Sequence, residues 1–220
     1  MRICLVVLSD GWGGAESVVH DLARQLESKG ENILLILNSE IAEYFHDLKG
    51  VKMLDIGNWY PPTFKIDVLR RFAHRNNLFS RAVNLLLIYL DEIERYRRSF
   101  RIVKRLKARL SEDKMDIIHS HRAEADILLY HMRSSGLPIL STIHGEHALT
   151  GRVRSHPLGL PLLHFKGELF KRALSRMSAI SVVCKSEADA LHAWGVSTSK
   201  RIEIIHNGID LQSMKEVIAK

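Results

Sequence analysis

Short apolar runs alternate with amphipathic segments along most of the chain, and this alternation limits the possible folds more than any other feature. Seven runs have the length and composition of strands that are buried on both faces of a sheet. They are Arg2–Leu8, Asn32–Leu37, Val51–Ile56, Asp116–His121, Pro138–Ile143, Ala179–Cys184 and Arg201–Ile205. The pattern predicts an α/β fold, a doubly wound, Rossmann-like and mostly parallel seven-stranded sheet with helices on both faces.

Three segments between these runs show the spacing of apolar residues that is typical of an amphipathic helix. They are Gly14–Ser28, Ala123–Ser134 and Ser186–Trp194. Ser186 is a plausible N-cap for the last of them, because its hydroxyl can accept a backbone N–H in the first turn.

Composition is that of a folded domain rather than a disordered or membrane-spanning chain. The 220 residues are 46% hydrophobic and 26% charged, enough for one large domain with its own core. The longest apolar run, Leu85–Leu90, is far shorter than the roughly 20 residues of a membrane span. Cys4 and Cys184 both fall in apolar runs, so we expect two buried free thiols and a reducing, cytoplasmic location.

Positive charge is concentrated in one part of the chain. The formal net charge is +7, yet residues 70–109 alone hold twelve Lys or Arg and three Asp or Glu, a balance of +9. Residues 57–111 contain no clear strand and interrupt the alternation with a helical, insertion-like segment. Its basic side chains lie mostly off the apolar face of a long predicted helix, and they include Arg95, Arg98, Arg101, Lys104 and Arg105.

This basic helix suggests an anionic surface as its partner, such as the inner face of a cell membrane. A solvated helix that packs on the sheet explains the same pattern equally well. Nucleic acid is not expected, because no recognition motif accompanies the charge.

The first loop of the predicted sheet carries glycines followed by the start of a helix. Gly13 and Gly14 allow the backbone to approach a ligand closely, and the free N–H groups of the helix attract anions such as a diphosphate. Glu16 lies in the first turn. The glycines fit neither the dinucleotide-binding spacing nor a P-loop, so the motif alone leaves open a turn without a ligand.

Histidines follow two of the predicted strands at the edge where such sheets bind ligands. His119 and His121 share a face, but no third ligand is near in sequence, so a metal site is not expected. We expect a hydrogen-bonding role for His121, whereas for His119 a structural and a functional role fit the sequence equally well. His144 leaves the fifth strand directly and precedes Gly145 and Glu146, so it is the strongest candidate for function.

Taken in order, these motifs resemble the N-terminal, acceptor-side domain of family 4 glycosyltransferases, which have the two-domain GT-B fold. The resemblance covers nearly the whole chain. It rests on Gly13-Gly14-Ala15-Glu16, Asp116-Ile117-Ile118-His119-Ser120-His121, Thr142-Ile143-His144-Gly145, Ser181-Val182-Val183-Cys184-Lys185-Ser186 and Ile205-His206-Asn207-Gly208-Ile209-Asp210.

The resemblance implies a role for each matching residue. His144 matches the active-site histidine that contacts a hydroxyl of the transferred sugar, and Gly13 and Gly14 match the loop near the donor diphosphate. Further cleft-lining positions are implied for Glu16, His121, Gly145, Glu146 and Ser186. Such enzymes transfer a sugar from a nucleotide-diphosphate-sugar co-substrate with retention, generally without a metal or another cofactor. Several relatives act on glycan or lipid-linked acceptors at a membrane.

The resemblance also implies a division into domains. Residues 1–210 form the acceptor-side domain, and residues 211–220 begin a linker to a C-terminal donor-binding domain. That domain carries a basic pair and a Glu-x7-Glu pattern, which this sequence lacks after Asp210. We therefore expect an incomplete catalytic unit. Two alternatives stay open: a non-catalytic half that binds a membrane or a partner chain, and a nucleotide-sugar epimerase of the same architecture.

Overall fold

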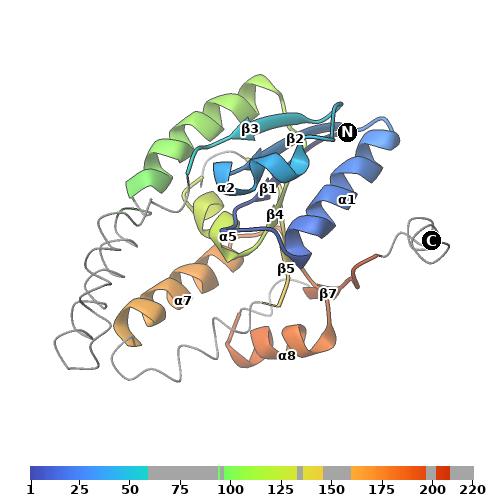
Figure 1. Ribbon diagram of the computed structural model, residues 1–220. Coiled ribbons are helices and arrows are strands. Elements are labelled where there is room, and N and C mark those ends of the chain that lie inside the picture. The colour runs from blue at the N-terminus through green and yellow to red at the C-terminus, as the bar shows by residue number, and fades with distance from the viewer. Residues whose placement is uncertain (59–93, 95–96, 133–135, 146–159, 197–201, 209–220) are drawn as a thin grey trace, which may run out of the picture.

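The sheet has seven parallel strands in the order β3-β2-β1-β4-β5-β6-β7 (Figure 1). The computed structural model describes residues 1–58, 94, 97–132, 136–145, 160–196 and 202–208. Its strands are β1 (Arg2–Val7), β2 (Asn32–Leu37), β3 (Lys52–Asp55), β4 (Ile117–His121), β5 (Ile139–Ile143), β6 (Ala179–Val182) and β7 (Ile202–Ile204). The predicted fold class and the positions of all seven predicted strands are confirmed, with ends that differ by at most two residues. The prediction that every strand is buried on both faces was wrong for β3 and β7, because they are the outermost strands of the sheet and have no buried residue.

Helices connect the strands. They are α1 (Gly14–Ser28), α2 (Ser39–Ala42), the short 3-10 helix η1 (Glu43–Phe45), α5 (Ala123–Tyr130), α7 (Leu160–Leu174) and α8 (Lys185–Ala193). Residues 97–112 are helical as well. The prediction for α1 is confirmed at both ends, whereas α5 ends at Tyr130, four residues before its predicted end.

Alternate residues of β1 enter two different cores, which is why helices cover both faces of the sheet. Ile3 and Leu5 pack with Val19 of α1, while Cys4 and Val6 join the cluster that includes Leu128 of α5. Because side chains alternate between the faces of a strand, a continuous apolar run is required at this central position. A third cluster lies between β5, β6 and the helices α5, α7 and α8.

The two thiols differ in their surroundings. Cys4 is fully buried, and this burial raises the pKa of its thiol. Cys184 is only half-buried, so the prediction of a buried thiol was wrong for this residue. The reason is that β6 ends at Val182, which leaves Cys184 in the turn before α8 rather than within a buried strand.

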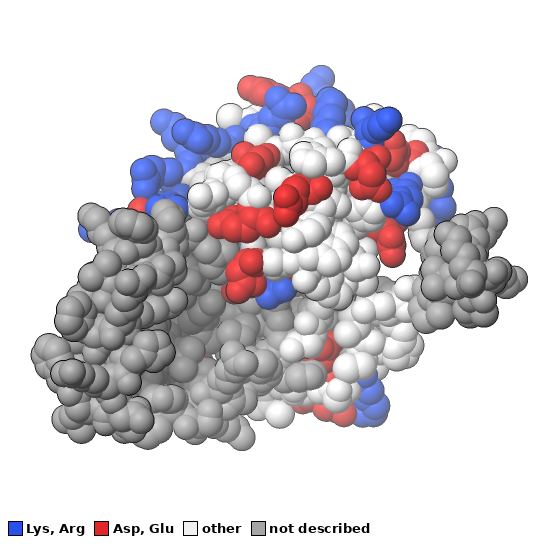
Figure 2. Space-filling model, in the orientation of Figure 1, with Lys and Arg blue, Asp and Glu red and all other residues white. Residues whose placement is uncertain are grey.

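The helix of residues 97–112 packs its apolar side on the sheet and turns its basic side outward. Val103, Leu106 and Leu110 are buried in the core. Phe100, an apolar residue three positions before Val103, is nevertheless 52% exposed. Figure 2 shows Lys and Arg side chains gathered along this helix. None of the helices in the described ranges is both long and apolar enough to span a membrane.

The predicted basic residues of this helix divide into paired and exposed ones. Arg98 contacts Glu94 at 3.2 Å and donates to the carbonyl of Asn58 at 3.0 Å. Arg101 lies 3.4 Å from the same carboxylate. Lys104 and Arg105 are exposed. Arg95, most of the segment 57–111 and the predicted linker 211–220 lie outside the described residues.

Strand order reverses between β1 and β4, and this reversal locates the candidate site. β2 and β3 lie in chain order on one side of β1, and β4 to β7 lie in chain order on its other side. In open parallel sheets, ligands bind beyond the carboxyl ends of the strands at such a switch point. The register places Val7, His121 and Thr142 level with one another, so the loops after β1, β4 and β5 leave the sheet side by side.

Candidate functional site

The loop after β1 is held by side-chain hydrogen bonds at its beginning and lacks a side-chain cap at its end. The backbone N–H of Ser9 donates to Asn38 Oδ1 at 2.9 Å, and Asn38 Nδ2 donates to the carbonyl of Ser9 at 2.6 Å. Gly13 then caps α1 with extended backbone and without a side-chain cap. A Cβ at Gly13 would lie 3.1 Å from Glu16 Oε2, so a larger residue would crowd that carboxylate. The first N–H groups of α1 therefore remain available to an anion.

Glu16 is a fully buried carboxylate whose cationic partner comes from the next loop. Arg122 Nη1 lies 3.0 Å from Glu16 Oε1 and 3.2 Å from Ser9 Oγ. The second carboxylate oxygen, Oε2, has no hydrogen-bond partner. A buried charge needs such a partner, and one oxygen that lacks a donor suits a ligand hydroxyl.

Arg122 holds this position at the cost of backbone strain. Its φ of 79° and ψ of 153° lie in a region that essentially only glycine occupies. Non-glycine residues adopt such angles at a cost of about 1–3 kcal/mol, and they occur mainly at functional sites. This conformation turns the chain from β4 into α5 and places the guanidinium between the first two loops.

His121 and His144 form a hydrogen-bonded pair across the tips of β4 and β5. His121 Nδ1 lies 3.0 Å from His144 Nε2, and the rings stack with a 23° angle between their planes. His121 is buried and His144 half-buried. The remaining nitrogens, His121 Nε2 and His144 Nδ1, have no partner. In a neutral pair one ring donates the hydrogen bond to the other. Of the two remaining nitrogens, one therefore carries a proton and the other can accept a hydrogen bond.

The surroundings keep both rings neutral near pH 7. Burial lowers the pKa of His121 well below its usual value, and the neighbouring His119 and His144 lower it further. Burial also lowers the pKa of His144, Arg122 adds to this effect, and Glu16 opposes it. A neutral imidazole at His144 can donate to or accept from a hydroxyl, as the sequence-based role requires.

Behind the pair, hydroxyl groups tie the central strands together. His119 Nε2 lies 2.7 Å from Thr142 Oγ1, which contacts Ser181 Oγ at 2.5 Å. Burial lowers the pKa of His119 to about 4, with a smaller effect from His144. His119 is therefore a neutral structural residue. The buried carboxyl of Asp126 accepts from Ser120 Oγ and, at 2.8 Å, from Ser141 Oγ.

Asp126 gives the domain a testable dependence on pH. Burial raises its pKa to about 7, although the two hydroxyl donors lower it. Between about pH 4 and pH 7 the folded chain therefore keeps a proton that the unfolded chain releases, so this group's contribution to stability falls as pH rises. Asp126→Asn resembles the protonated acid at every pH. We therefore expect its free energy of unfolding, measured relative to wild type, to rise by about 2 kcal/mol from pH 5 to pH 8.

Denaturant unfolding of both proteins at the two pH values measures this change. The comparison with wild type removes the opposite contribution of the buried histidines, whose lowered pKa values make stability rise with pH. An equal stability difference at both pH values would show that Asp126 does not change its protonation state between pH 5 and pH 8.

The remaining predicted residues lie at the β5 and β6 ends of the same edge. Gly145 has a φ of +72°, where a side chain would be strained, and a Cβ there would lie 3.6 Å from the buried carboxylate of Glu187. Ser186 is exposed and contacts Cys184 Sγ at 3.1 Å. Glu146 lies outside the described residues.

The predicted N-cap role of Ser186 was wrong. Helix α8 begins at Lys185, and its N-cap is Cys184, which makes no side-chain capping bond. Instead, Glu187 in the first turn reaches back and accepts the backbone N–H of Val183 at 3.1 Å. An acidic side chain can thus satisfy the turn before a helix without a capping hydroxyl.

The structure thus brings Gly13, Glu16, His121 and His144 to one edge of the sheet. Ser186 and Gly145 lie on that edge beside Glu187. Sequence reasoning missed Arg122 and Glu187 as members of this site. No group of three or more His, Cys, Asp or Glu residues among those the structure describes is arranged to hold a metal ion.

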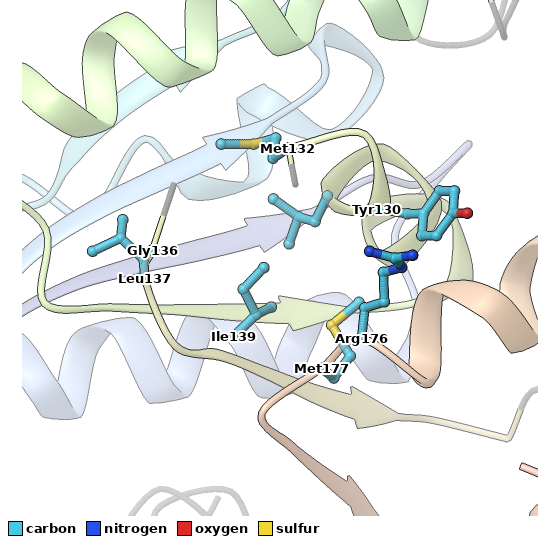
Figure 3. Close-up of a pocket in the computed structure, with 8 residues that line it drawn as sticks. Tyr130, Met132, Gly136, Leu137, Ile139, Arg176 and Met177 are labelled. Carbon is cyan, nitrogen blue, oxygen red and sulfur yellow. The ribbon is translucent and has the colours of Figure 1, made fainter. Parts of the chain in front are cut away.

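A separate cavity of about 330 Å³ lies at the opposite edge of the sheet (Figure 3). Its lining includes Gly136 and Leu137, which precede β5, Ile139, the first residue of β5, and Met177, which precedes β6. Arg176 stands over the ring of Tyr130 at 5.5 Å in the same cavity. None of the predicted site residues lines it.

Comparison with known proteins agrees with this architecture. The structure resembles sucrose-phosphate synthase from Thermosynechococcus elongatus with a TM-score of 0.66 and 15% identity, covering 96% of this chain and 49% of that one. It resembles the lipopolysaccharide outer core galactosyltransferase WaaB with a TM-score of 0.57 and 15% identity, covering 96% of this chain and 47% of that one. It resembles UDP-GlcNAc 2-epimerase from Methanocaldococcus jannaschii with a TM-score of 0.51 and 12% identity, covering 94% of this chain and 46% of that one.

At these identities the solved structures establish the fold, and the chain spans about half the length of each. No curated protein matches it significantly in sequence. The sequence model named Glycosyltransferase Family 4, however, matches residues 12–213, which includes every strand of the sheet except β1. The chain therefore belongs to glycosyltransferase family 4.

Proposed function

We propose that this chain is the acceptor-side half of a retaining glycosyltransferase that uses a nucleotide-diphosphate-sugar donor and a glycan or lipid-linked acceptor. The observation that carries the proposal is the convergence of an uncapped helix N-terminus, the buried Glu16 paired with Arg122, and a neutral His121–His144 pair at the switch point. Each supplies a group that a sugar diphosphate or a hydroxyl can bind.

The proposed roles follow from the chemistry of these groups. The N-terminus of α1 faces the donor diphosphate, since backbone N–H groups and the helix dipole favour an anion. His144 hydrogen-bonds a hydroxyl of the transferred sugar through the nitrogen that His121 leaves unpaired. The unpaired Glu16 oxygen accepts a further hydroxyl close to the glycine loop. We assign most contacts to the donor's nucleotide to a second, donor-binding domain; the chain spans about half the length of these similar structures, which leaves room for such a domain in the complete protein.

The test is a transfer assay with the complete protein and a panel of UDP-, GDP- and ADP-hexoses. Release of nucleoside diphosphate reports turnover, and the anomeric configuration of the product reports the stereochemistry. We expect turnover that needs an acceptor, keeps the donor's configuration and persists in a metal chelator. Inversion, or turnover that a chelator abolishes, would contradict the proposal.

An epimerase is the second candidate, and the similarity to UDP-GlcNAc 2-epimerase is the observation that favours it. The same assay separates the two reactions. Epimerised free nucleotide sugar, formed without any acceptor, would support the epimerase and exclude the transferase.

The basic helix supports a further part of the proposal, a peripheral location at the inner face of the cell membrane. Lys104 and Arg105 are exposed on the outer side of the helix of residues 97–112. Each Lys or Arg near an anionic leaflet contributes about 1 kcal/mol to binding. We expect Lys104→Gln/Arg105→Gln to weaken binding to phosphatidylserine-containing vesicles by roughly 10- to 30-fold in a sedimentation assay.

The matched control is Lys29→Gln/Lys49→Gln, which removes two exposed lysines from elsewhere on the molecule. It should bind as wild type does, and high salt should release both proteins from the vesicles. Equal binding to neutral phosphatidylcholine vesicles would count against the electrostatic account.

A further inference from the structure

Two aromatic side chains lie exposed and side by side next to the glycine loop. Trp12 is 42% exposed and Tyr44 is 43% exposed. Their ring centroids are 5.0 Å apart, with a 35° angle between the planes. Aromatic rings of this size are among the most favourable groups to bury, so two of them open to solvent at one place indicate a contact surface.

The indole of Trp12 is held in place by groups packed against it. Phe45, which is fully buried, contacts it edge-on with a centroid distance of 5.6 Å. His20 contacts it edge-on at 6.0 Å and is itself fixed by Asp47, whose Oδ1 lies 2.8 Å from His20 Nε2. This support orients the ring before any ligand arrives, which reduces the entropic cost of binding.

The pair belongs to the same edge of the sheet as the candidate active site. Trp12 lies between Gly11 and Gly13, and Gly13 adjoins the carboxylate that pairs with Arg122. Tyr44 belongs to η1, which follows β2, and β2 is the direct neighbour of β1. A molecule that lies on these rings therefore borders the glycine loop.

The charges around the rings identify the kind of molecule that fits. Asp10 precedes Trp12 by two residues, Glu43 adjoins Tyr44, and both carboxylates are exposed, whereas the carboxylate of Asp47 is already paired with His20 and Arg24. Figure 2 shows Asp and Glu side chains gathered on the face that carries α2. Negative charge repels a phosphate group or an anionic leaflet, whereas carboxylates are strong acceptors for hydroxyl groups.

From these observations we propose that Trp12 and Tyr44 form a subsite for a neutral pyranose ring of the acceptor. The C–H face of the sugar lies on the aromatic rings, and its hydroxyl groups donate to the surrounding carboxylates. This inference rests on the proposed function for its assignment to the acceptor. The binding itself requires neither a donor nor turnover.

The experiment uses the indole N–H resonances of the ¹⁵N-labelled chain, which contains only three tryptophans, Trp12, Trp59 and Trp194. Trp12→Phe assigns the Trp12 signal. Methyl α-D-glucopyranoside, methyl β-D-galactopyranoside, maltose and lactose are the probes, each added to about 100 mM because a single ring binds with a Kd on the order of 1 mM or weaker. We expect at least one probe to shift the Trp12 signal to saturation, with Trp194 unchanged.

Tyr44→Ala should weaken that response roughly fivefold or more, the loss expected for one aromatic contact, while the indole spectrum confirms that the variant is folded. The control is Phe100→Ala, which removes an exposed ring from the helix of residues 97–112 and should leave the response unchanged. Glucose 6-phosphate should bind less tightly than methyl α-D-glucopyranoside.

Three results would overturn the subsite: no shift with any probe, an equal response in Tyr44→Ala and wild type, or a response to phosphatidylserine vesicles in place of sugars. The outcome is independent of the transferase proposal. A protein that transfers no sugar could still show the Trp12 response, and an active transferase without this response would reject the subsite alone.

Discussion

Replacement of His144 by alanine is expected to lower the rate of glycosyl transfer by roughly 10²- to 10³-fold in the complete protein. The neutral imidazole is held by His121 at 3.0 Å, so the orientation of its ring is fixed before a substrate binds. Alanine removes that hydrogen bond and also leaves His121 without its partner. The half-buried position of His144 makes a loss of folding a minor effect.

The assay is nucleoside diphosphate release at saturating donor, and the matched control is His46→Ala, which removes an exposed histidine from the turn after η1. The control should retain wild-type turnover. The turnover of His144→Asn, which keeps a side-chain donor and acceptor, should lie between those of His144→Ala and wild type. Wild-type turnover in His144→Ala would remove this residue from the mechanism.

Replacement of Arg122 by alanine is expected to lower the free energy of unfolding by roughly 3 kcal/mol. The change leaves the fully buried carboxylate of Glu16 without the guanidinium that lies 3.0 Å away. For a chain of this length such a loss corresponds to a fall of about 6–12 °C in Tm. Arg24→Ala, which breaks an exposed ion pair with Asp47, is the control and should cost less than about 1 kcal/mol.

A glycine at the same position separates the ion pair from the backbone strain. Arg122→Gly also loses the guanidinium, but glycine occupies a φ of 79° and a ψ of 153° without strain. It should therefore be more stable than Arg122→Ala by about 1 kcal/mol or more. Glu16→Gln should reduce the cost of Arg122→Ala, because no buried charge then remains. An alanine variant that is more stable than the glycine variant by about 0.4–1 kcal/mol would show that the backbone at this position is unstrained.

The fold could be predicted from the sequence because its dominant signals are local. A strand that is buried on both faces must be apolar throughout, so the central strands β1 and β2 stand out as continuous runs. The position of His144 could be predicted for the same reason. It follows a buried strand directly, and the carboxyl ends of parallel strands meet at one edge of the sheet.

The partners within the site could not be predicted, since they join residues far apart in the chain. Nothing in the sequence indicates that Arg122 adopts a positive φ or that it pairs with Glu16, which is 106 residues away. The elevated pKa of Asp126 likewise depends on burial that only the packed sheet creates. The predicted N-cap at Ser186 failed because the carboxylate of Glu187 satisfies the local N–H group instead.

The most direct test of the central claim is to locate the substrate on the molecule. In the complete protein, labelled with ¹⁵N, a titration with UDP-glucose, GDP-mannose or ADP-glucose should shift the amides of Gly13 and Gly14 together with the ring signals of His144. The exposed His46 should not respond. A response confined to Gly136, Leu137 and Ile139, at the opposite edge of the sheet, would contradict the account.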